Sequence, residues 1–221
     1  MPRVILHNAV SADGRVDWFI PDTGLFYSLT SRWNEDATLA GSETILASDL
    51  EVDDGDPAPG NGRLEGDTRP ILVVPDTRGR IRCWGGLRAS GYWREFISIG
   101  TGATPRSHLK YLERSGVKCL VAGEKHVDLA CALEQLRRRF RVKTLRVDSG
   151  GTLNGVLLRM GVVSEVSLLI HPALVGGFSP ASMFRAADLQ STEGVLKLRL
   201  KDVQRLKGGV VWMVYSVAGG P

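Results

Sequence analysis

The sequence contains few cysteines and no pair of them at a metal-binding spacing. Cys83, Cys119 and Cys131 are odd in number, and no two of them form a CxxC motif. A disulfide framework and a zinc site built on cysteine pairs are therefore not expected, and we predict no metal. Unpaired thiols also fit a reducing compartment, so a cytoplasmic location is predicted.

Long apolar runs and a one-sided charge are also absent. No stretch approaches the ~20 apolar residues that a transmembrane helix requires. The opening MPRVILHNAV turns polar at Ser11, too early for a secretory signal. The 28 basic residues only slightly outnumber the 24 acidic ones, and the densest basic run, residues 137–141, ends a predicted helix, where cations suit the dipole. We therefore expect neither a membrane nor a nucleic acid as partner.

Several motifs of nucleotide enzymes are missing as well. The sequence has no complete GxGxxG after its first predicted strand, no Walker A motif, and no tyrosine with lysine four residues later. His126-x-Asp128 differs from the His-x-Glu of zinc deaminases, and no Pro-Cys-x-x-Cys follows it. These absences argue against a short-chain dehydrogenase, a P-loop enzyme and a deaminase.

The sequence does contain an alternation of apolar runs and helical patterns. Strands are predicted at short, β-branched apolar runs, and helices where apolar residues recur at helical spacing. This alternation is typical of a mainly parallel sheet flanked by helices, and we predict a single α/β domain over residues 1–221. The predicted strands are residues 4–10, 37–40, 71–74, 96–99, 117–121, 144–147 and 166–170, and the predicted helices are residues 24–32, 105–114, 129–139 and 152–160.

The C-terminal part follows a different pattern. Residues 195–203 alternate in hydropathy, and Gly208-Gly209 separates them from the apolar run of residues 210–217. Two such runs joined by a glycine turn predict an antiparallel hairpin added to the edge of the parallel sheet.

An apolar strand at a sheet edge needs a cover. Trp212, Met213 and Tyr215 would be exposed if the last run formed the edge, and natural edges are usually paired or covered. We therefore predict a homodimer. The alternative is a strand inside the sheet, flanked on both sides. The loop of residues 49–69, rich in Asp, Gly and Pro, is predicted to be functional or mobile because of its length.

The segment from residue 144 to residue 172 has the composition of a ligand-binding strand, turn and helix. Asp148 ends the strand, Gly150 and Gly151 form the turn, and Thr152 and Leu153 open the helix. A helix that begins at a bare glycine turn presents free N–H groups and a positive dipole end, which suit a phosphate. For these residues alone, an ordinary strand-to-helix turn is an equal alternative.

These residues are part of an ordered set of short motifs. The set comprises Ser11-x-Asp13-Gly14, Gly41-x-x-Thr44, Asp76-x-Arg78-Gly79-Arg80, and Asp148-x-Gly150-Gly151-Thr152-Leu153 followed by Glu165 and Pro172. In this order, and over nearly the whole chain, it resembles the reductase domain of riboflavin biosynthesis. The resemblance implies a dihydrofolate-reductase-like fold with a C-terminal antiparallel hairpin, a stand-alone reductase and a dimer.

The resemblance also implies a reaction. It would be the NADPH-dependent reduction of a ribosylamino-pyrimidine 5′-phosphate to its ribitylamino form, with a hydride added to C1 of the opened ribose. Two alternatives stay open, because fold alone does not decide function. One is reduction of dihydrofolate or another pterin, and the other is a regulatory domain that binds NADPH without turnover.

The cofactor residues are assigned partly by chemistry and partly by the resemblance. A guanidinium fits a 2′-phosphate, so Arg78 and Arg80 predict NADPH rather than NADH, with a solvated turn as the alternative. The resemblance places Thr44 in the cofactor site, where a helix cap is the alternative. The predicted cofactor set is Thr44, Ser48, Asp76, Arg78, Arg80, Gly150, Gly151, Thr152 and Leu153.

Asp148 is the predicted catalytic residue and also a predicted substrate ligand. The resembled family usually has Glu at this position, so the side chain here is one methylene shorter. Asn8, Ser11 and Asp13 cluster at the end of the first predicted strand and are predicted to bind the substrate, although Asp13 could equally hold a turn. Proton delivery to the sugar ring oxygen is assigned to Asp148 or to water.

Overall fold

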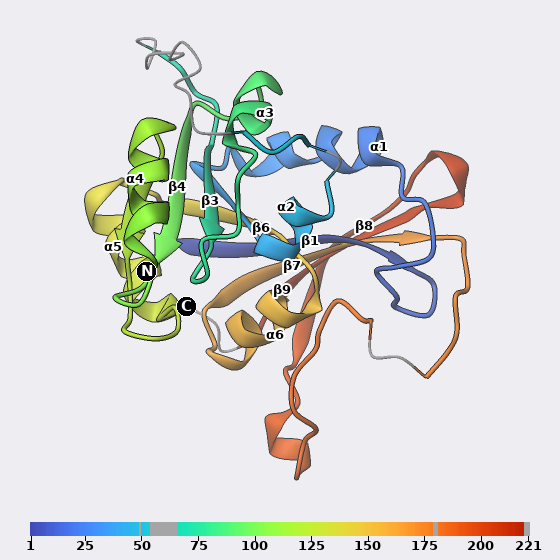
Figure 1. The fold of residues 1–221 in the computed structure, drawn as a ribbon. Helices are drawn as coiled ribbons and strands as arrows, with labels where there is room; N and C mark the ends of the chain where they lie inside the picture. Colours follow the sequence, from blue (N-terminus) through green and yellow to red (C-terminus); the bar gives the residue numbers. More distant parts are fainter. Residues whose placement is uncertain (49, 54–65, 179–180, 219–221) are drawn as a thin grey trace. The chain divides into compact units, whose positions relative to one another are not determined.

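Residues 1–48, 50–53, 66–178 and 181–218 are described by a computed structural model (Figure 1). They form two compact units. Unit 1 comprises Met1–Pro2 and Glu35–Leu145, and unit 2 comprises Arg3–Asn34 and Arg146–Pro221. The single domain over residues 1–221 stays a prediction. Most of the predicted loop of residues 49–69 lies outside the described residues.

Unit 1 contains the parallel strands β2 (Ala37–Ala40), β3 (Ile71–Pro75), β4 (Glu95–Gly100) and β5 (Lys118–Val121). They lie in the order β5-β4-β3-β2. All four strand predictions in this unit are confirmed to within one residue at each end. β3 is buried along nearly its whole length, which explains why it reads as a continuous apolar run and not as an alternating one.

The helices of unit 1 are α2 (Ser42–Leu46), α3 (Trp84–Ala89), α4 (Arg106–Arg114) and α5 (Leu129–Arg139). α5 has the predicted bounds and is capped by Asp128, whose carboxylate accepts a hydrogen bond from the Cys131 N–H at 2.9 Å. The sequence does not predict α3, because Gly85 and Gly86 interrupt its short helical pattern.

Helices α3 and α4 cover one face of the unit 1 strands. Their apolar side chains share a buried cluster with Leu72 and Val74 of β3. Because alternate residues of a strand point to opposite faces, Ile71 and Val73 face the other side. The largest members of the cluster are Trp84, Leu87, Phe96, Tyr111 and Leu112.

Unit 2 is built on β1 (Arg3–Ser11), β7 (Val163–His171), β8 (Leu198–Arg205) and β9 (Val211–Val217), and β6 (Thr144–Asp148) enters it at Arg146. β1 and β7 are parallel, whereas β9 is antiparallel to both β7 and β8. The ribbon shows β8 and β9 as the long hairpin at the red end of the colour scale (Figure 1). The predicted α/β class and the C-terminal antiparallel hairpin are therefore confirmed.

The predicted position of the last strand at the sheet edge is wrong. β9 lies between β7 and β8 and is paired on both sides. Trp212 is accordingly only 4 % exposed, and its indole N–H donates to Ser167 Oγ at 2.8 Å. The alternative, a flanked strand, is the one that the structure bears out. The outer strand is β8, where Leu198, Leu200 and Val203 are exposed.

The predicted helix of residues 24–32 divides into α1 (Thr23–Ser28) and the 3₁₀ helix η1 (Thr30–Trp33). Asp22 caps α1 by accepting a hydrogen bond from the Leu25 N–H at 2.8 Å. α6 (Gly151–Arg159) begins and ends one residue earlier than predicted. Across the described ranges, none of the helices combines the length and the apolar character that a bilayer crossing demands.

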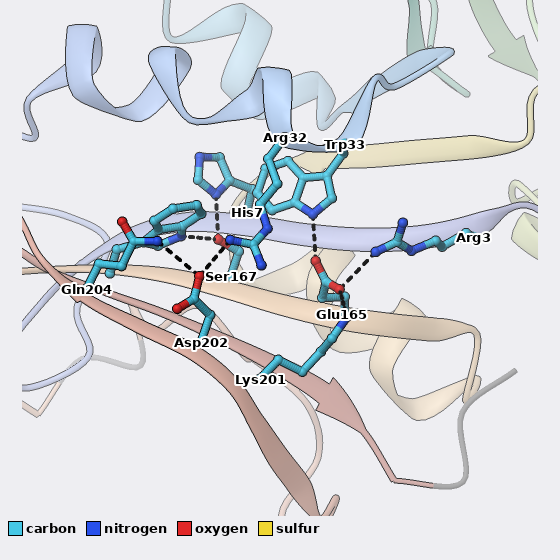
Figure 2. A network of polar contacts seen from close by, with 10 residues as sticks. Arg3, His7, Arg32, Trp33, Glu165, Ser167, Lys201, Asp202 and Gln204 are labelled. Atoms are coloured by element: carbon cyan, nitrogen blue, oxygen red, sulfur yellow. Dashed lines mark hydrogen bonds and ion pairs between the residues drawn. The ribbon is translucent and has the colours of Figure 1, made fainter.

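A buried carboxylate joins the strands of unit 2 to η1 (Figure 2). Glu165 on β7 is 2 % exposed and accepts hydrogen bonds from Trp33 Nε1 at 2.6 Å, Lys201 Nζ at 2.8 Å and Arg3 Nη2 at 2.9 Å. Burial by itself would raise the pKa of Glu165, but the hydrogen bonds from Lys201 and Trp33 and the charge of Arg3 outweigh it and lower the pKa. A charged carboxylate therefore holds β1, β7, β8 and η1 together.

A second buried network holds α1. The Nε2 atom of His7 lies 3.0 Å from the Phe26 carbonyl oxygen, and its Nδ1 lies 2.9 Å from Ser167 Oγ. Nε2 must donate to the carbonyl, so Nδ1 accepts from the Ser167 hydroxyl, which accepts in turn from Trp212. Burial lowers the pKa of His7 to about 3. The hydrogen bond to the Phe26 carbonyl opposes this shift, and the positive charge of Arg146 adds to it.

The neutral imidazole of His7 makes the stability of the protein depend on pH. Its pKa is about 3 in the fold and 6.5 in the unfolded chain, so the unfolded state binds an extra proton between these values. The contribution of neutral His7 to the free energy of unfolding is complete above pH 6.5. It is lost as the pH falls, by up to about 1.4 kcal/mol per pH unit. We expect the free energy of unfolding to fall from pH 6.5 to pH 4.5, and His7→Gln to flatten that slope.

Urea unfolding at several pH values measures both slopes. The window ends at pH 4.5, the ordinary pKa of a glutamate, because the lowered pKa of Glu165 adds its own loss below it. The buried His108, whose pKa is also lowered, contributes to the slope of both proteins, so the difference between the two slopes reports on His7. A variant slope equal to that of the wild type would contradict the assignment of the pH dependence to His7.

Candidate functional site

In unit 1, the turn between β3 and α3 is shaped by Asp76. Its carboxylate is 3 % exposed and accepts hydrogen bonds from the backbone N–H groups of Arg80 and Ile81, both at 2.9 Å. These bonds curl the chain around the carboxylate, and Gly79 takes a left-handed conformation with φ 66°. Both oxygens of Asp76 therefore accept hydrogen bonds from the turn itself. The side chain of Asp76 holds the turn in shape and does not stand as a free carboxylate.

The two arginines of this turn differ in their surroundings. Arg80 is ion-paired with Glu43 of α2. Arg78 is exposed, and within the described ranges its guanidinium has no hydrogen-bond or ion-pair partner. Of the two predicted phosphate ligands, Arg78 is therefore the one with an open guanidinium, and Arg80 would have to leave or share Glu43.

His108 of α4 packs under the same turn. A Cβ on Gly79 would lie 2.6 Å from the imidazole Cγ, so only glycine allows this close approach. The imidazole is 1 % exposed, and its Nε2 lies 3.5 Å from Asp76 Oδ2. Burial lowers the pKa of His108. The negative charge of Asp76 opposes this shift, and the positive charge of Arg82 adds to it. Sequence reasoning does not find His108, because a lone histidine in a helix carries no signal.

Thr44 does not have the helix-cap position that the sequence allows as an alternative. Gly41 holds the N-cap position, so Thr44 is not a cap but the third residue of the helix, on its exposed side. The Ser48 hydroxyl donates to the Ile45 carbonyl at 2.6 Å and so closes the end of the helix. Of the two, Thr44 has the hydroxyl with no hydrogen-bond partner in the described part of the chain.

In unit 2, Asp148 at the end of β6 is partly exposed and has two neighbours. Its Oδ2 accepts a hydrogen bond from the Tyr27 hydroxyl at 3.2 Å and lies 3.3 Å from Nη1 of the buried Arg146. The predicted catalytic carboxylate is thus held by a phenol and a guanidinium. Sequence reasoning misses Tyr27, because it lies on α1, far away along the chain, within a segment that shows no site pattern.

The glycine turn after β6 is only partly open. A Cβ on Gly150 would meet nothing within 4 Å, as the predicted phosphate cradle requires. A Cβ on Gly151, in contrast, would lie 2.0 Å from the Ser182 carbonyl oxygen, and one on Gly155 would lie 1.9 Å from that of Arg185. The interpretation of Gly151 as a residue kept bare for a ligand is therefore wrong: its Cα faces residues 182–185, which cross α6 there.

The start of α6 nevertheless keeps an open end. α6 has no side-chain cap at Gly150. In the described ranges, the N–H groups of Thr152 and Leu153 have no hydrogen-bond acceptor. Unsatisfied N–H groups at a helix start favour an anion. The structure therefore leaves the predicted cradle to Gly150 and to the backbone of the first turn.

Asn8 is a structural partner of this turn. Its Nδ2 donates to the Ser149 carbonyl at 2.8 Å, and its Oδ1 accepts from Asn154 Nδ2 at 2.9 Å. Asn154 is fully buried in α6 and also reaches the Met183 carbonyl at 3.0 Å. The predicted substrate residue Asn8 thus fixes the end of β6 to the start of α6, and the apolar pattern of the helix gives no hint that Asn154 is buried.

Ser11 and Asp13 form the turn that the sequence offers as the alternative to substrate binding. The Ser11 hydroxyl donates to Asp13, whose carboxylate also accepts from the N–H groups of Val175 and Gly176, the latter at 2.6 Å. The hydrogen bond from Ser11, followed by that from Gly176, lowers the pKa of Asp13 to about 2. This pair ties the end of β1 to the segment after β7.

The distribution of titratable groups limits what each unit can bind. In the described ranges, no three His, Cys, Asp or Glu side chains gather closely enough to hold a metal ion. What is present is a partly exposed carboxylate in unit 2, an open helix start beside it in the chain, and an exposed arginine on a rigid turn in unit 1. These groups suit the binding of anionic and hydrogen-bonding ligands.

The chain matches the family model of the RibD C-terminal domain over residues 2–212. It is also similar to two proteins named 2,5-diamino-6-ribosylamino-4(3H)-pyrimidinone 5′-phosphate reductase. With that of Methanothermobacter thermautotrophicus it shares 28% identity over 233 aligned positions, which cover 99% of each chain. With that of Aquifex aeolicus it shares 22% identity over 211 positions, which cover 90% of each chain.

Solved structures show the same fold. Acinetobacter baumannii RibD superposes with a TM-score of 0.73 at 22% identity, covering 99% of this chain and 58% of that one. The riboflavin biosynthesis reductase of Saccharomyces cerevisiae superposes with a TM-score of 0.68 at 21% identity, covering 98% and 90%. The chain thus spans a little over half of the Acinetobacter protein. The predicted fold is confirmed.

Gly151→Ala should destabilise the protein, whereas Gly150→Ala should not. The methyl group at position 151 would overlap the Ser182 carbonyl and force residues 182–185 away from α6, at a cost of about 1–3 kcal/mol. At position 150 the methyl group meets open space, and φ −74° suits alanine. Urea unfolding of both variants measures the difference. Equal stabilities would mean that the crossing segment does not need the glycine.

Proposed function

Because the chain belongs to the RibD C-terminal domain family, we propose that it is an NADPH-dependent oxidoreductase of riboflavin biosynthesis. Its substrate is a ribosylamino-pyrimidine 5′-phosphate and its product the ribitylamino form. The observation that carries the proposal is the similarity to the Methanothermobacter reductase, which extends over nearly all of both chains. Coverage of this kind goes beyond a shared fold, which alone would host many activities.

The proposed reaction opens the sugar ring before it is reduced. The bond from C1 to the ring oxygen breaks as that oxygen gains a proton and the amino nitrogen on C1 loses one, which leaves an imine. A hydride then adds to C1, and the nitrogen takes the electron pair of the double bond and a proton. When bound, NADPH supplies the hydride. The chain itself aligns the reacting groups and excludes water.

The residues of unit 2 fit an anionic dinucleotide at the start of α6. Gly150 provides open space, and the N–H groups of Thr152 and Leu153 are available. We assign them, with the Gly151 backbone, to the pyrophosphate. Asp148 is assigned to the substrate. Its partners in the fold leave part of the carboxylate exposed.

Asn8, Ser11 and Asp13 are proposed to frame the substrate site rather than to bind through free side chains. Asn8 holds the Ser149 carbonyl, and Ser11 with Asp13 holds the backbone of residues 175–176. Each of these bonds fixes a loop that follows a strand of unit 2. Loops placed in this way on a rigid strand frame commonly carry ligands.

In unit 1, we assign Arg78 to the 2′-phosphate that distinguishes NADPH from NADH, because its guanidinium is exposed. Asp76 and Arg80 support the assignment through the shape of the turn, since the Asp76 carboxylate holds the Arg80 N–H. Thr44 on α2 and Ser48 just after its end are assigned to the cofactor through their hydroxyl groups, Thr44 being the more available of the two.

NADPH oxidation by the purified full chain tests the proposed function. The substrates to compare are the diaminopyrimidinone phosphate, the aminouracil phosphate and dihydrofolate. We expect turnover with a ribosylamino-pyrimidine phosphate and none with dihydrofolate. Turnover with dihydrofolate alone would identify a pterin reductase, and tight NADPH binding without any turnover would identify a regulatory domain.

Arg78→Ala should weaken NADPH binding by about tenfold to a hundredfold and leave NADH binding nearly unchanged. The reason is the loss of one charge-assisted contact to the 2′-phosphate. Arg80→Ala is the matched control on the same turn and should have a smaller effect, because Arg80 is already paired with Glu43. Calorimetric titration with both cofactors measures the affinities. Equal losses for NADPH and NADH in Arg78→Ala would refute the assignment.

The protein should form a homodimer in solution. β9 lies inside the sheet and needs no partner chain to cover it. The outer strand β8 does need a cover, because it exposes the apolar side chains of Leu198, Leu200 and Val203. Light scattering at micromolar concentration should give about twice the 24.0 kDa of one chain. A mass near that of one chain would rule the dimer out.

A further inference from the structure

Helix α1 places a phenol against the predicted catalytic carboxylate. The Tyr27 hydroxyl lies 3.2 Å from Asp148 Oδ2, and the Tyr27 ring lies 5.9 Å from the Arg146 guanidinium. Tyr27 is 45 % exposed, whereas Arg146 is buried. The phenol therefore stands at the surface beside the carboxylate, and the guanidinium lies beneath it, as the burial of the two side chains shows.

The position of Tyr27 is fixed from both ends of its segment. At the start, Asp22 caps α1, and the neighbouring Phe26 stacks on the buried His7 with ring centroids 4.2 Å apart. At the end, Trp33 of η1 donates to the buried Glu165. A side chain on an element anchored in this way is pre-organised, so it needs little reordering when a ligand arrives.

The two donors meet on one oxygen of Asp148. Both the Tyr27 hydroxyl and Arg146 Nη1 contact Oδ2, whereas Oδ1 has no hydrogen-bond partner among the residues that the structure describes. Two contacts on a single oxygen fix the rotation of the carboxylate group. They also leave the lone pairs of the other oxygen for a donor that is not part of the fold.

We propose that Tyr27, together with Arg146, is a positioning residue that orients Asp148 so that Oδ1 accepts a hydrogen bond from an N–H or O–H group of the substrate. This inference rests on the proposed function and names how its substrate is recognised. A ribosylamino-pyrimidine phosphate offers such donors on its amino groups and its sugar hydroxyls. Tyr27 acts through Asp148 and need not touch the substrate.

Tyr27→Phe tests the inference, because it removes the hydroxyl and keeps the ring on α1. We expect kcat/KM to fall by about tenfold, with unchanged NADPH affinity and an unchanged melting temperature. The matched control is Tyr215→Phe on β9, whose hydroxyl has only Met213 Sδ at 3.5 Å as its partner. That control should keep the wild-type kcat/KM.

A double-mutant cycle with Asp148→Asn separates positioning from a merely structural effect. Calorimetric affinity for the ribitylamino product serves as the readout, so the cycle does not require turnover. If Tyr27 acts through Asp148, Tyr27→Phe should weaken product binding about tenfold in the wild type and less than about twofold in Asp148→Asn. Additive losses would overturn the inference.

The remaining outcomes distinguish this inference from the function on which it rests. An active wild type with an unaffected Tyr27→Phe would overturn the positioning role alone. A wild type that neither reduces a ribosylamino-pyrimidine phosphate nor binds the product would overturn the proposed function and the inference with it. A lower melting temperature of Tyr27→Phe that accounts for the whole loss would assign Tyr27 to the fold.

Discussion

The buried carboxylate of Glu165 is the interaction on which most of unit 2 depends. A lone charge at that depth would be strongly unfavourable, and three donors offset this cost. Each donor comes from a different element, so the charge can be satisfied only when β1, β8 and η1 are all in place (Figure 2). The network therefore specifies one arrangement of these elements, beyond what apolar packing would do.

The consequence extends from the core to the candidate site. Because Trp33 anchors η1 and Phe26 anchors α1 on His7, the intervening backbone has little freedom. Tyr27 is carried on that backbone and meets Asp148 at the end of β6. The contact between the surface Tyr27 and the partly exposed Asp148 thus depends on two buried networks, one centred on His7 and one on Glu165, and Phe26 of the first packs against the Tyr27 ring.

Glycine has different roles in the two turns that the sequence singles out. Gly79 is needed because it packs on the His108 imidazole, and Gly151 because the Ser182 carbonyl approaches its Cα. Neither position is bare for a ligand. Gly150, in contrast, has the open space that a glycine-rich phosphate turn suggests. A glycine pattern therefore indicates close approach, but only the fold shows whether protein or ligand makes it.

The sequence by itself determined the strands, the α/β class and the order of the motifs. Strands of buried parallel sheets carry their pattern locally, as β3 does with four apolar residues in a row, so their bounds follow from neighbours along the chain. The helical pattern also located α5 with its correct ends, because the Asp128 cap lies next to it in the sequence.

Tertiary structure alone decided the partners of each polar group and the neighbours of each strand. Three contacts join residues far apart in the sequence: the pairing of β9 with β7 and β8, the hydrogen bond from Tyr27 to Asp148, and the packing of His108 against Gly79. Such contacts leave no local periodicity, because each depends on where a second element lies after folding. For this reason the sequence predicted roles for Asp148 and Arg78, and only the fold showed that Tyr27 contacts the first and that Asp76 and His108 shape the turn of the second.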